Sequence, residues 1–275
     1  MKLGVTYIAF DGIELIEHSI KQIRNHVDYI SVIYQNVSWF NKKLPNESLV
    51  ELKSLVNKKL VDEIIPFSSF SPLYNKSAHS ILKSKGYERE KRQFALFHCL
   101  KRGCTHFLCM DVDEFYVSQE FAYAKAEIAK NNYDLTAVRF INYVNVPTVH
   151  RGYDPMRVPF ICKVTNSSKL GKNFFVKCDP TRGISNGSKK HEFNPSLITM
   201  HHMESVRKDL FLKYDSTTRA VFKRERTQAL VQEIQRVNHE SHLFDFKKII
   251  FPGVNNVKLT HCKNIFNIPY ESWIK

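Results

Sequence analysis

The sequence lacks the short motifs that mark several large enzyme classes. It has no GxxxxGK[ST], GxSxG or GxGxxG pattern, which excludes the usual ATPase, α/β-hydrolase and dehydrogenase assignments. It has no run of about 18 apolar residues, so we expect no segment that spans a membrane. We also expect no signal peptide, because Met1 and Lys2 lead directly into a strand-like segment.

Metal-binding cysteine patterns are missing as well. The six cysteines include no CxxC pair, and Cys99, Cys104 and Cys109 lie in apolar segments typical of a buried core. His239, His242 and Cys262 have no second ligand pair at metal spacing, so we reject a zinc site there. These features predict a reduced, cytoplasmic protein.

Acidic residues are outnumbered by basic ones. The chain of 275 residues holds 41 Lys and Arg against 27 Asp and Glu, a net charge of +14. Residues 151–275 carry +11 of this excess and residues 1–150 carry +3. A basic surface can simply promote solubility. The asymmetry instead favours an anionic partner for the C-terminal half: nucleic acid, an acidic membrane face or a phosphate-bearing substrate.

Strand and helix patterns alternate in the first half of the chain. This alternation predicts an α/β fold with a mostly parallel sheet covered by helices on both faces. The second half shows strands separated by long polar loops and fewer helices. We expect one continuous domain, with a first half over residues 1–135 and a second half over residues 136–275. The expected strands are Leu3–Phe10, Tyr29–Tyr34, Val61–Phe67, Thr105–Met110, Ala137–Tyr143, Phe160–Val164 and Leu197–His202, and the expected helices are Ile13–Val27, Asn46–Lys58, Glu88–Arg102, Ser118–Lys130, Arg207–Lys213 and Arg224–Asn238.

An acidic motif follows the strand that ends at Met110. It reads Asp111-Val112-Asp113-Glu114 and stands where a parallel sheet presents its ligands. Three carboxylates in four residues repel each other unless a cation neutralises them, and oxygen ligands suit Mg²⁺ or Mn²⁺. The alternative is a helix N-terminus, where acidic residues are also favoured.

This motif and several other segments resemble a known family. An opening LGVTYIAF, the string GCTHFLCMDVDEFY, and later VPF, DPTR and MHHMESVRKD are similar to GT2-like glycosyltransferases found in tailed-phage and some bacterial genomes. The resemblance covers about residues 1–215 and implies the Rossmann-like GT-A fold. It implies transfer of a sugar from a nucleotide-diphosphate sugar, with a UDP-sugar expected. Residues 1–135 would then form the nucleotide-sugar-binding half and residues 136–275 the acceptor-binding half.

The resemblance also implies roles for individual residues. Asp113 would bind Mn²⁺ or Mg²⁺ directly, Asp111 would hold the ribose or the metal, and Glu114 is better explained as a helix cap. A late histidine often completes the metal site, and only one of His201 and His202 can face it from a strand; position favours His202. The nucleotide-sugar site would be formed by Phe10, Asp11, Lys91, Arg92, Asp111, Arg182, Arg207 and Lys208. For five of these residues simpler roles stay open: Asp11 as a helix N-cap, the Lys91–Arg92 pair as a solvated helix face, and Arg207 and Lys208 as surface charge.

Transfer with inversion needs a carboxylate that deprotonates the acceptor hydroxyl. Asp179, in a turn rich in Pro and Gly, is the first candidate, and Glu204 and Glu192 are its rivals. Asp179 can also act only as a turn cap.

The acceptor is left open between two classes. The basic second half favours DNA carrying a hydroxymethylated pyrimidine, with Tyr143, Tyr153, Phe174 and Phe175 available to hold an extruded base. A surface polysaccharide or lipid-linked glycan is the alternative, although no basic amphipathic helix for a membrane surface is evident. A third hypothesis is an inactive GT-A fold that binds nucleic acid.

Overall fold

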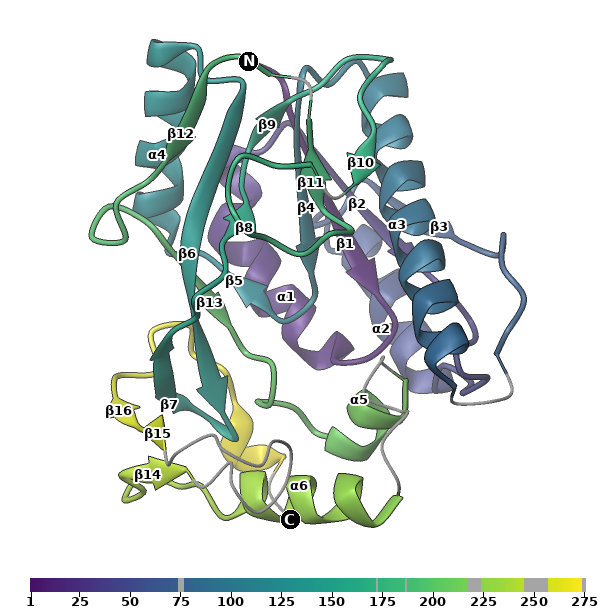
Figure 1. Ribbon diagram of the computed structural model, residues 1–275, viewed down its shortest axis with the longest axis vertical. Coiled ribbons are helices and arrows are strands. Elements are labelled where there is room, and N and C mark those ends of the chain that lie inside the picture. The colour runs from purple at the N-terminus through teal and green to yellow at the C-terminus, as the bar shows by residue number, and fades with distance from the viewer. Residues whose placement is uncertain (74–76, 172, 186, 217–223, 245–256, 274–275) are drawn as a thin grey trace.

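The structure is a computed structural model that describes residues 1–73, 77–171, 173–185, 187–216, 224–244 and 257–273. It is a mixed α/β fold in which parallel strands are flanked by helices, so the predicted fold class is confirmed (Figure 1). Among the described residues, no helix has both the length and the apolar character needed to cross a bilayer.

The first sheet has five strands in the order β3-β2-β1-β4-β9. Its first four strands are parallel, and β9 is antiparallel to β4. Their side chains alternate between two hydrophobic clusters, one on each face of the sheet. The strands are β1 (Leu3–Ala9), β2 (Tyr29–Tyr34), β3 (Glu63–Pro66), β4 (His106–Asp111) and β9 (Cys162–Lys163).

Helices cover both faces of this sheet. The cluster on one face includes apolar side chains of α1 (Ile13–Ile23), α2 (Asn46–Asn57) and α4 (Ser118–Asn131). The cluster on the other face includes residues of α3 (Ala78–Lys101), which Figure 1 shows at the outer edge of the molecule. A short 3-10 helix, η1 (Arg24–His26), extends α1. Burial of these apolar stripes gives the first half its core.

A second sheet, which the sequence did not predict, occupies the other half of the fold. Its strands run in the order β16-β7-β6-β13-β5, and β8 and β12 also pair with the long strand β6. Its members are β5 (Glu114–Phe115), β6 (Leu135–Val144), β7 (Val146–Tyr153), β8 (Val158–Pro159), β12 (Lys190–Glu192), β13 (Thr199–His202) and β16 (Thr260–His261).

The C-terminal region packs against the second sheet. Residues of α5 (Leu210–Ser216), α6 (Arg224–Gln235) and η3 (Tyr270–Ser272) join side chains of β6, β7 and β5 in one cluster. Figure 1 shows α6 at the end of the molecule far from the N-terminus. Two small antiparallel sheets complete the described fold: β10 (Leu170–Gly171) with β11 (Gly183–Ile184), and β14 (Leu243–Phe244) with β15 (Val257–Lys258).

The helix before the acidic motif is longer than predicted. It begins at Ala78 rather than at residue 88, and the Ser77 side chain accepts a hydrogen bond from the Ser80 N–H at its N-terminus. Lys91 and Arg92 therefore lie in the middle of this helix and not at its start. The helix predicted to start at residue 207 is α5, which begins at Leu210.

The acidic motif joins the two sheets. Asp111 is the last residue of β4 in the first sheet, and Glu114 is the first residue of β5 in the second. Parallel pairing of β1 with β4 places Ile8 opposite Asp111, and antiparallel pairing of β5 with β13 places Glu114 opposite His202. The two sheets thus bring the end of β1, the motif and His202 to one place.

Candidate functional site

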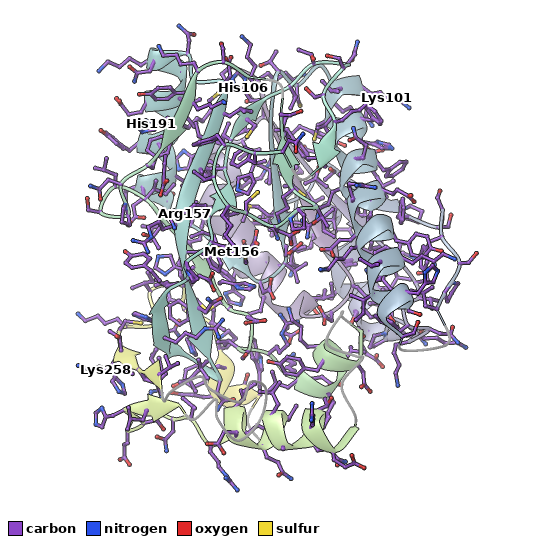
Figure 2. All side chains as sticks on the ribbon, in the orientation of Figure 1. Lys101, His106, Met156, Arg157, His191 and Lys258 are labelled. Carbon is purple, nitrogen blue, oxygen red and sulfur yellow. The ribbon has the colours of Figure 1, made fainter. Side chains whose placement is uncertain are left out.

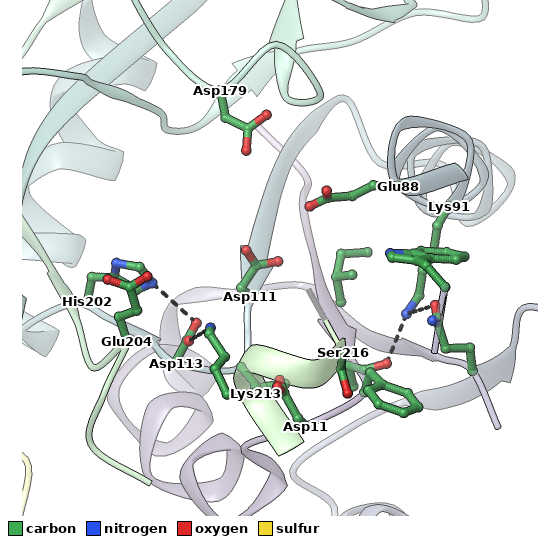
Figure 3. A pocket seen from close by; sticks show the side chains of 16 residues that line it. Asp11, Glu88, Lys91, Asp111, Asp113, Asp179, His202, Glu204, Lys213 and Ser216 are labelled. Atoms are coloured by element: carbon green, nitrogen blue, oxygen red, sulfur yellow. Dashed lines mark hydrogen bonds and ion pairs between the residues drawn. The ribbon is translucent and has the colours of Figure 1, made fainter. Parts of the chain in front are cut away.

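A pocket of about 310 Å³ opens at the carboxyl ends of β1 and β4 (Figure 3). This is the edge at which open α/β sheets bind their ligands. Acidic groups dominate its ionisable lining, with two lysines and one histidine among them. These side chains are Asp11, Glu88, Asp111, Asp113, Asp179, Glu204, Lys91, Lys213 and His202.

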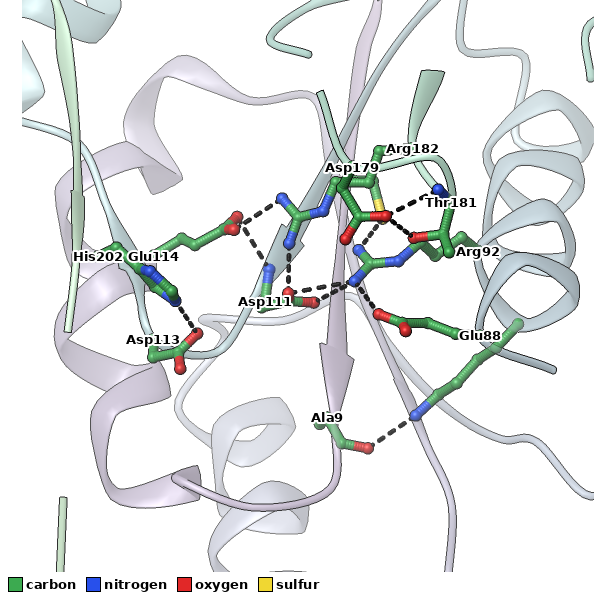
Figure 4. Close-up of polar contacts among 12 residues, drawn as sticks. Ala9, Glu88, Arg92, Asp111, Asp113, Glu114, Asp179, Thr181, Arg182 and His202 are labelled. Atoms are coloured by element: carbon green, nitrogen blue, oxygen red, sulfur yellow. Dashed lines mark hydrogen bonds and ion pairs between the residues drawn. The ribbon is translucent and has the colours of Figure 1, made fainter. Parts of the chain in front are cut away.

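Two buried arginines hold Asp111. Arg92 Nη2 lies 2.9 Å from Asp111 Oδ1 and 3.1 Å from Oδ2, and Arg182 Nη2 also donates to Oδ2 (Figure 4). Burial alone would raise the pKa of Asp111, but the guanidinium groups of Arg182 and Arg92 lower it to about 2. Both oxygens of Asp111 are therefore engaged by the protein, and the prediction that Asp111 is a metal ligand does not match this arrangement.

Glu114 is neither a helix cap nor a free ligand. Its side chain is 3% exposed, its Oε1 lies 2.7 Å from Arg182 Nη1, and its Oε2 accepts the Asp111 N–H at 3.1 Å. Arg182 therefore neutralises Glu114 and Asp111 together, so the predicted phosphate contact by Arg182 is replaced by a structural ion pair. The helix-cap prediction failed because residues 114–115 form a strand.

Asp113 uses its two oxygens differently. Its Oδ2 accepts from Arg207 Nη2 and, at 2.9 Å, from Lys213 Nζ, whereas its Oδ1 faces His202 Nε2 at 3.6 Å. Burial by itself would raise the pKa of Asp113, but Lys213, His202 and Arg207 hold it well below its usual range. Asp113 is therefore ionised, with one oxygen turned to the histidine.

The two adjacent histidines point in opposite directions. His202 lines the pocket, and its Nδ1 lies 2.8 Å from Asn142 Oδ1. His201 lies in the core on the other side, where its Nδ1 pairs with the Tyr143 hydroxyl at 2.9 Å and burial lowers its pKa to about 4. Strand alternation thus brings His202, and not its neighbour, to the acidic motif.

Asp11 is paired with Arg207 and does not cap a helix. Its Oδ1 lies 3.1 Å from Arg207 Nη1, and the N-cap of α1 is Gly12, without a side-chain cap. Gly12 has a φ of +67°, and a Cβ there would lie 2.9 Å from Arg207 Nη1. Glycine therefore permits both the left-handed turn and the approach of the arginine. Because Arg207 is 1% exposed, the surface-charge alternative is wrong, and its contact with a phosphate stays a prediction.

The Lys91–Arg92 pair is buried, so the solvated-face alternative is also wrong. Lys91 Nζ donates to the Ala9 carbonyl at 2.9 Å and to Gln35 Oε1 at 3.0 Å, at the wall of the pocket. Burial lowers the pKa of Lys91 to about 7, and the nearby Arg92 acts in the same direction. Lys91 is thus a buried amine whose hydrogen bonds go to neutral acceptors.

Two of the three candidate bases line the pocket. The Thr181 N–H and hydroxyl both donate to Asp179 Oδ1 at 2.8 Å, and burial of Asp179 is offset by Arg92 and Arg182, which lower its pKa. Glu204 also lines the pocket, and its Oε2 lies 3.7 Å from Arg151 Nη2. Glu192 lies on β12, where it pairs with Arg157, away from the pocket lining.

Several predicted contact residues are not brought to the pocket. Lys208 is exposed, and its Nζ lies 5.6 Å from the Trp273 ring centroid. Tyr143 is buried against His201 in the second cluster. None of the four aromatic side chains proposed to hold a DNA base belongs to the pocket lining.

Among the polar and aromatic residues that line the pocket, the sequence reasoning gave no individual role to Gln35, Trp39, Glu88, Lys213 and Ser216. Gln35 and Trp39 follow β2, and the carboxyl end of that strand already indicated that the residues just after it line the cleft. Glu88 precedes Arg92 by one helical turn and pairs with it at 2.7 Å, a spacing readable from the sequence. Lys213 and Ser216 arrive from α5 through tertiary packing and carried no local signal.

Asp113 Oδ1 and His202 Nε2 are spaced as two ligands of one divalent cation would be, and the metal site itself stays a prediction. Two ligands that each lie about 2.1 Å from one cation are roughly 3 to 4 Å apart, which brackets the observed 3.6 Å. That separation is too long for a hydrogen bond. Within the described part of the chain, no group of three or more His, Cys, Asp or Glu side chains is arranged to hold a metal. A cation here would have two protein ligands and would take its others from water and substrate, as Mg²⁺ and Mn²⁺ commonly do.

Comparisons with known proteins give distant structural similarity only. No family model matches the chain, and no curated protein does. Solved structures of S. aureus TarS align over 52% of this chain at 13% identity: the full-length protein with a TM-score of 0.35 over 22% of its length, and residues 1–349 in complex with UDP with a TM-score of 0.37 over 36%. The same fragment in complex with UDP-GlcNAc gives a TM-score of 0.36 over 35% of its length. A structural similarity with such low identity and TM-scores assigns no activity, so the function must be argued from the chain's own residues.

Proposed function

We propose that the protein transfers a sugar from a nucleotide-diphosphate sugar, with UDP-sugar as the expected donor, to a hydroxyl acceptor. The observation that carries this proposal is the facing pair of Asp113 Oδ1 and His202 Nε2, 3.6 Å apart, in the pocket where β1 and β4 end. Lys213 lies on the other oxygen of the same carboxylate. An anionic diphosphate would meet a cation site and an ammonium group together.

Charge balance supports a metal-dependent reaction. Six carboxylates and two lysines line the pocket. Adding Glu114 and the four arginines that pair with these carboxylates (Arg92, Arg151, Arg182 and Arg207) gives seven negative groups against six positive ones, of which Lys91 has its pKa lowered to about 7. A diphosphate would increase the negative excess, so its binding calls for a further cation. When bound, Mn²⁺ or Mg²⁺ would act as a Lewis acid on the leaving diphosphate, and the histidine favours Mn²⁺.

The chain's own groups would orient the donor. Phe10, Gln35 and Trp39 supply aromatic and amide surface for the nucleobase on one side of the pocket. Lys213 would contact the diphosphate, and Asp113 holds that ammonium in place. Arg182 and Arg92 lower the pKa of Asp111, and Arg207 helps lower the pKa of Asp113, so these two carboxylates are held ionised.

Asp179 is our proposed general base for an inverting transfer. Both hydrogen bonds that described residues make to it fall on Oδ1, and the two nearby arginines keep it ionised at neutral pH. Glu204 is the competing candidate. Asp179→Asn should lower kcat about 100-fold or more while leaving KM for the donor within about threefold. If Glu204→Gln loses kcat in this way and Asp179→Asn stays active, Glu204 is the general base instead.

For the acceptor we propose a hydroxymethylated pyrimidine in DNA, supported by the +11 charge of residues 151–275. Figure 2 shows Lys101 and Lys258 on opposite sides of the molecule, so basic side chains are not confined to one face. A glycan is the second candidate. The carboxylates Glu88, Asp179 and Glu204 in the pocket favour it, because they can accept hydrogen bonds from sugar hydroxyls and repel phosphates.

A transfer assay tests the proposal. The purified protein is incubated with Mn²⁺, a panel of radiolabelled nucleotide sugars, and three acceptors in parallel: hydroxymethylcytosine DNA, cytosine DNA and a mixture of glycans. Label on the modified DNA alone supports the DNA acceptor, and label on glycans supports the alternative. No sugar transfer or release from any donor, in a protein that binds DNA equally with and without chelator, would instead indicate an inactive binding module. His202→Gln should lose activity, and Lys208→Met, outside the pocket, should keep it.

A further inference from the structure

A chain of three side chains leads away from the proposed cation site. His202 Nδ1 lies 2.8 Å from Asn142 Oδ1 on the neighbouring strand β6, and Asn142 Nδ2 lies 3.2 Å from Asp154 Oδ2. Asp154 is itself fixed, because its Oδ1 accepts the Met156 N–H at 3.0 Å and its own N–H donates to the Phe140 carbonyl at 2.9 Å. Asn142 is only 2% exposed, so its amide is buried between two partners.

The carboxylate of Asp154 determines which way this amide points. An ionised carboxylate only accepts hydrogen bonds, so the NH₂ group of Asn142 must face Asp154. The carbonyl oxygen of Asn142 must then face His202. Since a carbonyl oxygen also only accepts, His202 Nδ1 must carry a proton.

The tautomer of His202 follows from this chain. In a neutral imidazole with a proton on Nδ1, the other nitrogen carries a lone pair. That nitrogen, Nε2, faces Asp113 Oδ1 at 3.6 Å. In this neutral form the Nε2 lone pair and the Asp113 carboxylate oxygen repel each other unless a positive charge, either a proton or a bound cation, lies between them, so the neutral arrangement is prepared for a cation.

We propose that Asp154 and Asn142 are positioning residues that fix His202 in the tautomer whose Nε2 binds the divalent cation of the sugar-transfer site; this inference rests on the proposed function. Because the amide of Asn142 stands between Asp154 and His202, the proton is fixed on Nδ1 without a second negative charge beside the histidine. Such outer partners of a metal-binding histidine typically change metal affinity by about 10- to 100-fold.

The test measures metal binding and the histidine tautomer on the full chain. Mn²⁺ alone is titrated into the protein and followed by electron paramagnetic resonance. The tautomer is read from ¹⁵N chemical shifts of labelled histidine, with the His202 signal assigned by its loss in His202→Gln. We expect Nδ1 of His202 to carry a proton in the wild type. Asp154→Leu should weaken Mn²⁺ binding about tenfold or more and shift the proton toward Nε2.

Two further variants make the result interpretable. Tyr143→Phe removes the hydrogen bond to His201 on the opposite face of the same two strands, and it should leave Mn²⁺ affinity within about twofold of wild type. If Asp154→Leu does not fold, Asp154→Asn removes the charge while keeping the shape and should shift both readouts in the same direction.

Three outcomes would overturn the inference. One is a wild-type His202 whose Nδ1 carries no proton in the metal-free protein. Another is an Asp154 variant that is folded and binds Mn²⁺ as tightly as the wild type. The third is a wild type that binds no Mn²⁺ at all, which would refute the metal dependence in the proposed function as well and is thereby distinguished from the second.

Discussion

Replacement of Asp111 by Asn should destabilise the metal-free protein. If Asp111 were a ligand facing an empty site, removing its charge would relieve repulsion among the carboxylates and leave stability unchanged or higher. The structure instead places Asp111 against Arg92 and Arg182, which are 1% and 6% exposed. Removing the charge would leave two buried guanidinium groups short of a counter-ion.

The expected loss can be estimated in two ways. The pKa of Asp111 is lowered from 3.8 to about 2, which corresponds to about 2 kcal/mol of favourable interaction in the folded state. Breaking a buried ion pair by removing one partner costs about 3 to 5 kcal/mol. Asn keeps the shape and still accepts one hydrogen bond, so we expect a loss of about 2 to 4 kcal/mol at pH 7.

Urea unfolding of both proteins in chelator measures this difference. Glu88→Gln is the control, because Glu88 is 28% exposed and pairs with the same Arg92, and it should cost less than about 1 kcal/mol. Because the folded pKa lies below the unfolded one, the stabilisation is present above about pH 4 and disappears as pH falls through about 2. The gap between wild type and variant should therefore narrow from pH 5 downward. A difference below about 0.5 kcal/mol at pH 7 would refute the reasoning.

Three other changes give independent tests. Gly12→Ala should lower the free energy of unfolding by about 1 to 3 kcal/mol, because the φ of Gly12 is +67° and the added Cβ meets Arg207. Gly86→Ala, which adds a Cβ to open space in a helix, should raise the free energy of unfolding by about 0.5 to 1 kcal/mol in the same assay. The stability of the wild type should rise between pH 7 and 10, because the unfolded chain binds more protons there than the folded one. Lys91→Met should abolish this rise. A wild type whose stability does not change over this range would contradict the assignment of Lys91 as a buried amine. Lys213→Met should weaken UDP binding about tenfold by calorimetry, and equal weakening by Lys208→Met, outside the pocket, would show a general charge effect instead.

The first half of the fold could be predicted because its signals are local. Buried strands such as Tyr29–Tyr34 are continuous apolar runs between turn residues, and helices such as Asn46–Asn57 show apolar residues at helical spacing. The position of Asp111 and Asp113 at the end of a strand follows from the same patterns. The second sheet could not be predicted in this way, because its order depends on pairing between segments far apart in the chain, such as β6 with β13.

Within the site, the sequence by itself determined where the acidic motif stands and that strand alternation admits only one of His201 and His202. What neutralises the carboxylates was decided by tertiary structure. Arg182 reaches Asp111 across 71 residues and Lys213 reaches Asp113 across 100, and no local pattern encodes such contacts. The orientation of His202 depends in turn on Asn142 and Asp154, which β6 and the segment after β7 bring together. Local periodicity fixes which residues can face a site, but ion pairs and hydrogen bonds between distant strands decide what charge and which proton each one holds there.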